Sequence, residues 1–230
     1  MTAGAGARGS RRQAREGWHR FHGRIAGVGS SSGVRVVLGS WERTPLGSFA
    51  DAMVEKADGH RVLLAPSPEV AAFIEQTYSF DEVRLEPITV ERSVAGVGRM
   101  ARGATWQVTS PSLTLELTLG SRLPLGWLLR AVPARLAASP GWATLVDPVA
   151  RMTMRGVRTR GTALAGRREF YGATDLRAVT ALSGSLDGVD LGVLAPVDPP
   201  CRFGFSSTPR RPSVTRVVTT VVASGDVVVP

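Results

Sequence analysis

The sequence predicts an α+β protein built on a single large curved antiparallel β-sheet or partly closed β-barrel, with a few helices packed outside it. Three observations predict this class. Residues 34–66 contain three strand-like runs joined by two tight connections, and residues 113–119 alternate apolar and polar side chains. Helical patterns are confined to residues 67–78 and 124–154.

The segment of residues 34–66 holds the densest mixture of apolar, aromatic and acidic residues in the chain. Its first strand alternates over residues 34–39 and breaks at residues 45–47, because proline fixes φ and glycine accepts positive φ. A second strand begins at Phe49. The Asp-Gly pair at residues 58–59 predicts a hairpin that leads into the third strand.

A helix is predicted to start at Ser67, which has the hydroxyl group of an N-cap and is followed by a proline and an acid. We expect this helix to end near Tyr78. Proline lacks an N–H group, so Pro133 should kink or split the helical segment 124–138, and the Asp-Pro pair at residues 147–148 should make a second break. The helical segments 124–138 and 142–154 are expected to pack against the sheet rather than contact a membrane.

Further strands are expected at residues 23–28, 83–90, 106–119, 167–182 and 214–222. Pro87 predicts an edge position or a bulge in the second of these. We expect one domain over residues 18–223, a disordered basic tail at residues 1–17 and a frayed tail at residues 224–230. Residues 96–103 are expected to form a loop of low complexity.

The chain of 230 residues has a net charge of +9 and a pI of about 11.3. Lys56 is the only lysine, and the arginines are scattered along the chain, as in the proteins of GC-rich genomes. A nucleic-acid surface usually gathers its basic residues in a patch or stripe, so nucleic acid is not the expected partner. Nucleic-acid binding through residues 1–17 and the Arg210-Arg211 loop is left open as an alternative.

Cys201 is the only cysteine, which excludes an internal disulfide and a cysteine-based metal cage. The chain shows neither a signal peptide nor an apolar run that could span a bilayer, so a cytoplasmic protein with no membrane partner is expected. With His19 and His22 beside the basic tail and His60 the one other histidine, neither a metal nor a cofactor is expected. Residues 29–33 match the G-x-S-x-G pattern of serine hydrolases, but the strand that follows them favours a hairpin loop.

The polar residues of the three-strand segment form the candidate site. Asp51 interrupts an apolar strand, and a buried carboxylate needs a partner, water or a ligand. Because side chains alternate along a strand, Asp51 and Glu55 share one face, and both are candidate catalytic residues. An alternative is a structural ion pair between Arg35 and Asp51. The candidate ligand-binding residues are Arg35, Trp41, Arg43 and Phe49, with Glu42 as a further polar residue.

Residues 45–51, Pro-Leu-Gly-Ser-Phe-Ala-Asp, lie between two of these strands. This segment resembles the Gly-Pro-Tyr-x-Glu segment of the acetoacetate decarboxylase family, with Gly47, Phe49 and Asp51 at the positions of its glycine, aromatic residue and glutamate. The resemblance implies a large, partly closed antiparallel β-barrel with helices outside it. That family reacts through a Schiff base on an interior lysine, whereas Lys56 lies at an exposed hairpin edge, so this activity is not expected.

We therefore expect a protein that binds a small acidic or apolar organic molecule in an internal pocket, without Schiff-base decarboxylase activity. The alternative is a lyase- or hydrolase-type enzyme that acts on a small carbonyl or carboxylate compound. It would use Asp51 or Glu55 as general acid or base and Arg35 to hold the anion. Both hypotheses require Asp51 to point into a hollow interior of the curved sheet. The sequence leaves the ligand and the oligomeric state open, including a homo-oligomer.

Overall fold

The computed structural model describes residues 17–93, 103–137, 139–153, 157–162 and 168–223. The predicted disordered tail therefore lies outside the described residues, except for Gly17, which begins the first strand. The predicted frayed tail at residues 224–230 and most of the loop at residues 96–103 also lie outside them.

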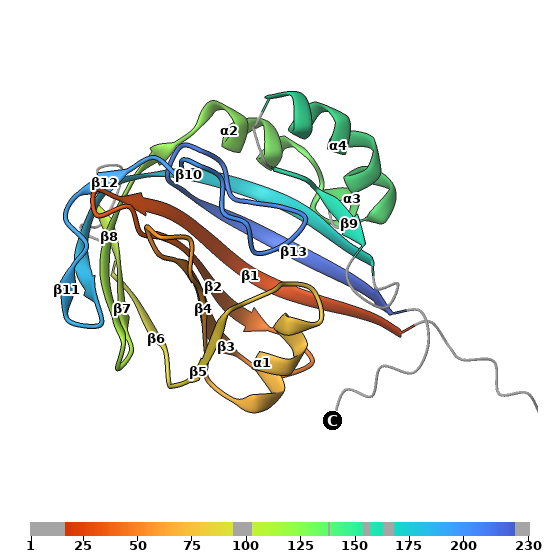
Figure 1. Ribbon diagram of the computed structural model, residues 1–230. Coiled ribbons are helices and arrows are strands. Elements are labelled where there is room, and N and C mark those ends of the chain that lie inside the picture. Colours follow the sequence, from red (N-terminus) through yellow and green to blue (C-terminus); the bar gives the residue numbers. More distant parts are fainter. Residues whose placement is uncertain (1–16, 94–102, 138, 154–156, 163–167, 224–230) are drawn as a thin grey trace, which may run out of the picture.

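The described residues form a 13-stranded sheet that curls into a half-barrel (Figure 1). This architecture confirms the predicted α+β class with a curved sheet. The strand order is β5-β4-β3-β2-β1-β13-β10-β8-β7-β6, and neighbours on this path are antiparallel except β4 and β5. The strands are β1 (Gly17–Ser30), β2 (Arg35–Arg43), β3 (Phe49–Glu55), β4 (Arg61–Ala65), β5 (Glu82–Leu85), β6 (Thr89–Ser93), β7 (Ala104–Thr109), β8 (Leu113–Arg122), β9 (Arg160–Thr162), β10 (Arg168–Leu186), β11 (Val189–Asp190), β12 (Leu194–Ala195) and β13 (Ser213–Ala223).

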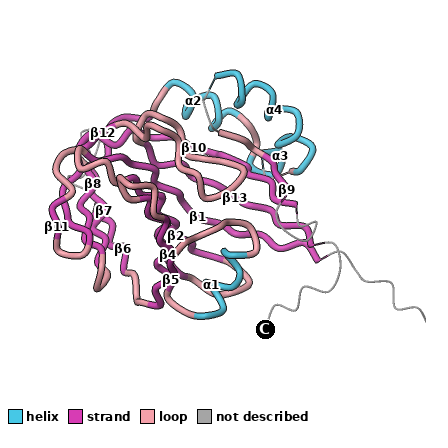
Figure 2. Tube along the Cα trace, viewed as in Figure 1, coloured by secondary structure: helices cyan, strands magenta, loops and turns pink. Residues whose placement is uncertain are grey.

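Helices cover the outside of the curl. They are α1 (Pro68–Glu75), α2 (Pro124–Ala131), α3 (Ala134–Ala137) and α4 (Pro140–Thr153). The first helix lies on β4 and β5, and the other three lie on β10, at the opposite side of the molecule (Figures 1 and 2). None of the described helices is long and apolar enough to cross a membrane.

The ends of the helices test the sequence predictions. The Ser67 hydroxyl oxygen accepts the Val70 N–H at 3.4 Å, which confirms the predicted N-cap, although α1 already ends at Glu75. Pro133 separates α2 from α3 as predicted. The break predicted at Pro148 is wrong, because α4 continues through this residue. The carbonyl that loses its N–H partner there belongs to an exposed turn of the helix, where water can replace the donor.

Strand β1 is longer than the predicted run of residues 23–28. Its first residues carry no alternating apolar pattern, but they continue the backbone ladder with β13 as far as the Gly17–Ala223 pair. A turn then leads directly into β2, with Gly33 at a φ of 86°. Since no helix follows this turn, residues 29–33 form the predicted hairpin loop and not a nucleophile elbow.

The inside of the curl is filled by apolar side chains. Residues of β2–β4 pack there against residues of β7, β8 and β10. Leu38, Leu64, Leu113 and Leu117 are among these side chains, and each is at most 1% exposed. The expectation that Asp51 points into a hollow interior is therefore wrong, because Leu and Val side chains occupy that volume. The binding and catalytic hypotheses can now rest only on a separate cavity at the outer face of the sheet, which Asp51 does line.

The outer face of the same strands is covered by two separate segments. Helix α1 packs on β4 through Leu63 and Ile74. The segment that precedes β13 packs on β2, where Phe203 and Cys201 contact Val37. Cys201 is thus a buried free cysteine, and burial raises the pKa of its thiol to about 12.

Candidate binding site

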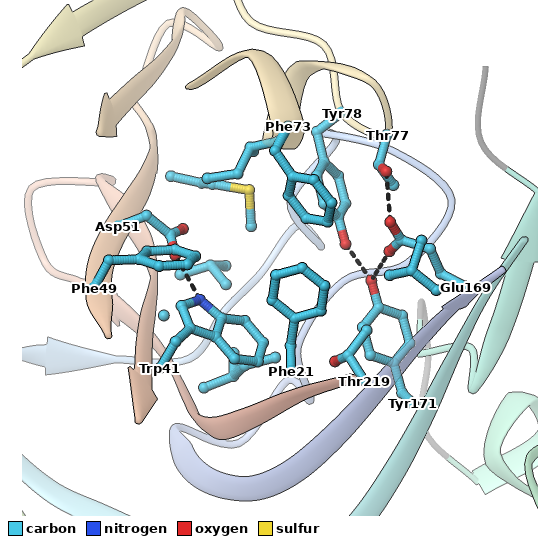
Figure 3. A pocket seen from close by; sticks show the side chains of 16 residues that line it. Phe21, Trp41, Phe49, Asp51, Phe73, Thr77, Tyr78, Glu169, Tyr171 and Thr219 are labelled. Carbon is cyan, nitrogen blue, oxygen red and sulfur yellow. Dashed lines mark hydrogen bonds between the residues drawn. The ribbon is translucent and has the colours of Figure 1, made fainter. Parts of the chain in front are cut away.

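A cavity of about 70 Å³ lies between the outer face of the sheet and α1. Alternate residues of β1, β2, β3, β10 and β13 point into it because successive strand side chains face opposite sides of a sheet. Its walls are mostly aromatic, and the two acids Asp51 and Glu169 stand on opposite sides of it (Figure 3). The aromatic lining residues are Phe21, Trp41, Phe49, Phe73, Tyr78 and Tyr171.

Asp51 is held in this cavity by its neighbours on β2. Its side chain is only 5% exposed, and its Oδ1 accepts a hydrogen bond from Trp41 Nε1 at 2.8 Å. Gly39 is the residue directly opposite Asp51 in the ladder. A Cβ atom at Gly39 would lie 2.6 Å from Trp41 Nε1 and closer still to Asp51 Oδ1. Glycine at this position therefore makes room for the Asp51–Trp41 hydrogen bond.

Burial raises the pKa of Asp51 to about 6, and the hydrogen bond from Trp41 acts in the opposite direction. Among the described residues, the Trp41 indole is the one hydrogen-bond donor to this carboxyl group. Asp51 consequently changes its protonation state close to neutral pH. When ionised, it is a strong acceptor in an apolar cavity that supplies little else to stabilise its charge.

On the opposite side of the cavity, Glu169 belongs to a hydrogen-bond network. It accepts hydrogen bonds from Thr77 Oγ1 at 2.6 Å and from the Tyr171 hydroxyl at 3.0 Å. The Tyr171 hydroxyl also bonds to the Tyr78 hydroxyl (Figure 3). Burial raises the pKa of Tyr171 well above its ordinary value, and the adjacent Tyr78 and Glu169 raise it further. Tyr171 therefore remains a neutral donor at physiological pH.

Thr219 adds an unsatisfied hydroxyl group to the cavity wall. The residue is 5% exposed, and its buried Oγ1 has no hydrogen-bond partner in the described structure. An unsatisfied buried hydroxyl costs about 1–3 kcal/mol. A bound molecule with a suitably placed polar group could recover part of that cost.

A larger cavity of about 160 Å³ lies beside the first. The two share Tyr78 and Tyr171 in their walls, so the hydrogen-bonded tyrosine pair lies at their boundary. Phe205 packs against both tyrosine rings, with centroids at 6.4 and 5.8 Å. Leu125 and Leu129 of α2 form part of the far wall. The larger volume is close to the 150 Å³ of an apolar protein cavity that binds benzene.

The structure brings three of the predicted site residues together. Trp41, Phe49 and Asp51 all line the smaller cavity. Arg35 and Glu55 do not line it, because they form a buried ion pair with each other at 3.0 Å. The alternative of an Arg35–Asp51 pair is wrong, since the strand register places Arg35 opposite Glu55.

The Arg35–Glu55 pair has a structural role in the fold. Arg35 Nη1 donates to the Pro199 carbonyl oxygen at 3.0 Å. Glu55 Oε2 accepts the Arg202 N–H at 2.8 Å, and Glu55 Oε1 accepts Arg202 Nε at 3.2 Å. The two buried charges therefore hold the segment before β13 against the sheet, and Glu55, unlike Asp51, does not face the cavity.

The remaining predicted residues also lie elsewhere. Arg43 lines a separate groove, and Glu42 binds Arg24 and Arg92. Lys56 Nζ lies 3.3 Å from Asp187 Oδ2 and lines neither cavity, as its predicted position at the hairpin edge suggests.

Sequence reasoning missed the far half of the site. Glu169 and Tyr171 share one face of β10 because they are two residues apart, and Phe21 and Thr219 come from the strands between β10 and β2. Alternation within each strand was a usable signal for which residues share a face. The strand order that brings β10 close to β3 has no local signal in the sequence.

Comparisons with known proteins add no relative to this description: no protein-family model, no curated protein and no solved structure matches the chain. Among the described residues, no group of three or more His, Cys, Asp or Glu side chains could hold a metal ion.

Proposed function

We propose that the protein binds a small elongated organic molecule, with a hydrogen-bond-donating head group at Asp51 and an apolar body in the larger cavity. The observation that carries this proposal is the Asp51 carboxyl group. It is 5% exposed, faces an aromatic cavity and receives a single hydrogen bond from the described residues. A buried carboxyl group in this position gains most from an amine or hydroxyl donor.

The charge around the smaller cavity favours a basic over an acidic head group. The described lining residues of the smaller cavity include the acids Asp51 and Glu169 but no arginine, lysine or histidine. Arg35, the cation expected to hold an anion, is bound to Glu55. Of the two ligand classes expected from the sequence, acidic and apolar, we therefore keep the apolar class and do not propose an acidic ligand.

The volumes decide how such a ligand is placed. A cavity of about 70 Å³ is too small for an aromatic ring, by comparison with the 150 Å³ that binds benzene, but it can hold a head group. The neighbouring 160 Å³ can hold the ring or an alkyl chain. The wall that the two cavities share includes the hydrogen-bonded Tyr78 and Tyr171, so a ligand that occupies both cavities would lie beside this pair.

A series of phenylpropyl compounds tests this proposal. 3-Phenylpropan-1-amine, 3-phenylpropan-1-ol and 3-phenylpropanoate share one apolar body and differ in the head group. We expect the amine to bind most tightly at pH 7.5, the alcohol less tightly and the carboxylate not at all. Binding is measured by calorimetry and by the NMR signal of the Trp41 indole N–H.

Two variants make this test specific. Asp51→Asn is expected to lower the affinity for the amine by about tenfold or more, because a charge-assisted hydrogen bond is lost. The amine should then bind no more tightly than the alcohol. Asp58→Asn is the matched control. It makes the same acid-to-amide change at an exposed hairpin residue that lines neither cavity. Equal affinity for all three compounds, or equal effects of the two variants, would contradict the proposal.

A second candidate function is general acid–base catalysis by Asp51 on a small carbonyl compound. It is supported by the pKa of about 6, which suits proton transfer near neutral pH, and by the cavity beside this carboxyl group. Glu55 is not part of this candidate. The test follows deuterium exchange at the carbon atoms next to the carbonyl group of 4-phenylbutan-2-one in D₂O. Exchange that is no faster with the natural protein than with Asp51→Asn would exclude this function.

The similarity of residues 45–51 to the acetoacetate decarboxylase family stays a prediction. If this similarity reflects common ancestry, the protein is a distant member of that family that lacks the imine-forming lysine. The binding proposal rests on the contacts of Asp51 and holds with or without that kinship.

A further inference from the structure

Helices α2, α3 and α4 expose several large apolar side chains. Half of the eight exposed large hydrophobic residues among the described residues lie on these three helices. They are Trp127 (63% exposed), Leu128 (66%), Leu136 (45%) and Leu145 (68%). Single exposed apolar residues are ordinary, but a group of them on one layer of helices indicates an interaction surface.

The same helical layer is cationic. Residues 123–153 contain three arginines and a single acid, Asp147. Asp147 is 4% exposed, and its Oδ1 accepts the Thr159 N–H at 2.8 Å. The described surface of these helices therefore presents arginines and apolar side chains without an exposed carboxylate.

A groove of about 1000 Å³ adjoins this layer, between the α2–α3 turn and strands β1, β2, β10 and β13. Five arginines line it and form no ion pair with any described acid. They are Arg20, Arg43, Arg130, Arg135 and Arg216. The two acids in the groove are engaged elsewhere: Glu42 binds Arg24 and Arg92, and Asp175 binds Arg122.

The lowered pKa of His22 is consistent with a positive potential in this groove. Burial lowers its pKa, and the nearby Arg43, Arg20 and Arg216 lower it further, against the opposite effect of Glu42. The groove therefore holds cationic charge that the described acids do not neutralise. Such a site attracts phosphate groups.

We propose that helices α2–α4 and the adjoining groove bind the surface of a bilayer that contains anionic lipids. Trp127, Leu128 and their neighbours would enter the interfacial region of the bilayer, and the groove arginines would contact lipid phosphates. Helix α2 has a second face in this arrangement, since Leu125 and Leu129 line the larger cavity. The lipid-binding surface and the ligand cavity thus lie on two sides of one helix.

The combination of apolar and cationic groups favours this partner over the others. A soluble phosphate or a nucleic acid would use the arginines and leave the exposed leucines and tryptophan in water. A second copy of the same surface would bring arginines against arginines. An anionic bilayer satisfies both features, and binding of this kind needs no helix that spans the membrane.

Co-sedimentation of the full chain with vesicles tests the proposal. We expect binding to vesicles of phosphatidylcholine with phosphatidylglycerol, little binding to phosphatidylcholine alone and weaker binding as the salt concentration rises. Trp127→Ala and Leu128→Ala should each weaken binding about tenfold. Arg130→Gln and Arg135→Gln should each weaken it about fivefold, the value for one cation near an anionic surface.

The controls carry comparable changes at exposed positions elsewhere: an apolar side chain shortened to alanine, or an arginine replaced by glutamine. Val189→Ala and Val193→Ala change residues that are each 68% exposed near β11, and Arg211→Gln changes an exposed arginine of the loop before β13. All three should leave vesicle binding unchanged. Equal loss in the controls, equal binding to neutral vesicles, or binding of glycerol phosphate or single-stranded DNA without vesicle binding would overturn the proposal. Since every changed side chain is exposed, circular dichroism should show a native fold for each variant.

Discussion

Trp41 Nε1 donates a hydrogen bond of 2.8 Å to Asp51 Oδ1 across the hairpin of β2 and β3. This contact fixes one oxygen of a buried carboxyl group and leaves the group facing an aromatic cavity. The carboxyl group is therefore both held in place and short of partners. Its protonation, its stability cost and its ligand preference follow from that arrangement, and the predictions below test them separately.

The first prediction concerns the pH dependence of stability. The folded protein raises the pKa of Asp51 from 3.8 to about 6, so between these values it binds more protons than the unfolded chain. The contribution of Asp51 to stability is then greatest below pH 4 and falls as the pH rises through 6, by up to about 3 kcal/mol. Asp51→Asn should remove this fall. Urea unfolding of both proteins from pH 4 to pH 7 measures this difference. The stability of the variant relative to the natural protein should increase as the pH rises.

A variant that is destabilised equally across that pH range would show that Asp51 has the ordinary pKa of an exposed carboxyl group. Asp58→Asn provides the reference, because its exposed side chain should not change the pH profile.

The second prediction concerns Gly39. A Cβ atom there would collide with Asp51 Oδ1 and Trp41 Nε1, so Gly39→Ala should break their hydrogen bond and cost about 1–3 kcal/mol of unfolding free energy. The Trp41 indole N–H signal should shift toward its position in free tryptophan. Gly141→Ala in α4 is the control, since a Cβ atom there meets nothing within 4 Å. That control should be neutral or stabilising by up to about 1 kcal/mol.

The third prediction separates ligand binding from packing. Thr219 and Ser213 both have a buried hydroxyl oxygen with no partner in the described structure, but only Thr219 lines the smaller cavity. Thr219→Val and Ser213→Ala should each stabilise the free protein by about 1–2 kcal/mol, because an unsatisfied group is removed. Thr219→Val alone should weaken binding of 3-phenylpropan-1-amine. Equal affinity in the two variants would mean that the Thr219 hydroxyl does not meet the ligand.

The fourth prediction concerns the buried ion pair. Removing one partner leaves an uncompensated charge, so Arg35→Met or Glu55→Gln should each cost about 3–5 kcal/mol. The double variant Arg35→Met/Glu55→Gln should cost less than the sum of the single changes. Denaturant unfolding measures this coupling. Additive losses would contradict the pairing, and a folded Glu55→Gln variant should keep its affinity for the amine.

The candidate site could be predicted in part from one hairpin. Trp41, Phe49 and Asp51 lie within eleven residues of one another and share a cavity as proposed. The pairing of Arg35 with Glu55 was also within reach, because this pair and the Gly39–Asp51 pair are both centred on residue 45, inside the predicted turn. The sequence analysis paired Arg35 with Asp51 instead, because both residues lie on the same face of neighbouring strands. Which residue lies opposite Arg35 depends on the strand register, and the register selects Glu55.

The other half of the site could not be read from local patterns. Glu169 and Tyr171 reach the cavity because β13 and β1 lie between β10 and β2 in the sheet, and long-range strand order is set by the packing of the whole chain. The filled interior has a similar cause. The pattern of β8 predicts which side chains face inward, but it does not say that the two ends of the sheet approach closely enough to fill the space between them.

The most direct test of the account is an NMR titration of the Asp51 carboxyl carbon, assigned with Asp51→Asn. For the free protein it should give a pKa of about 6, and saturating 3-phenylpropan-1-amine should lower that pKa, because a bound ammonium group favours the ionised carboxylate. A pKa close to 3.8 that the amine leaves unchanged would contradict the claim that Asp51 is a buried acceptor for a ligand.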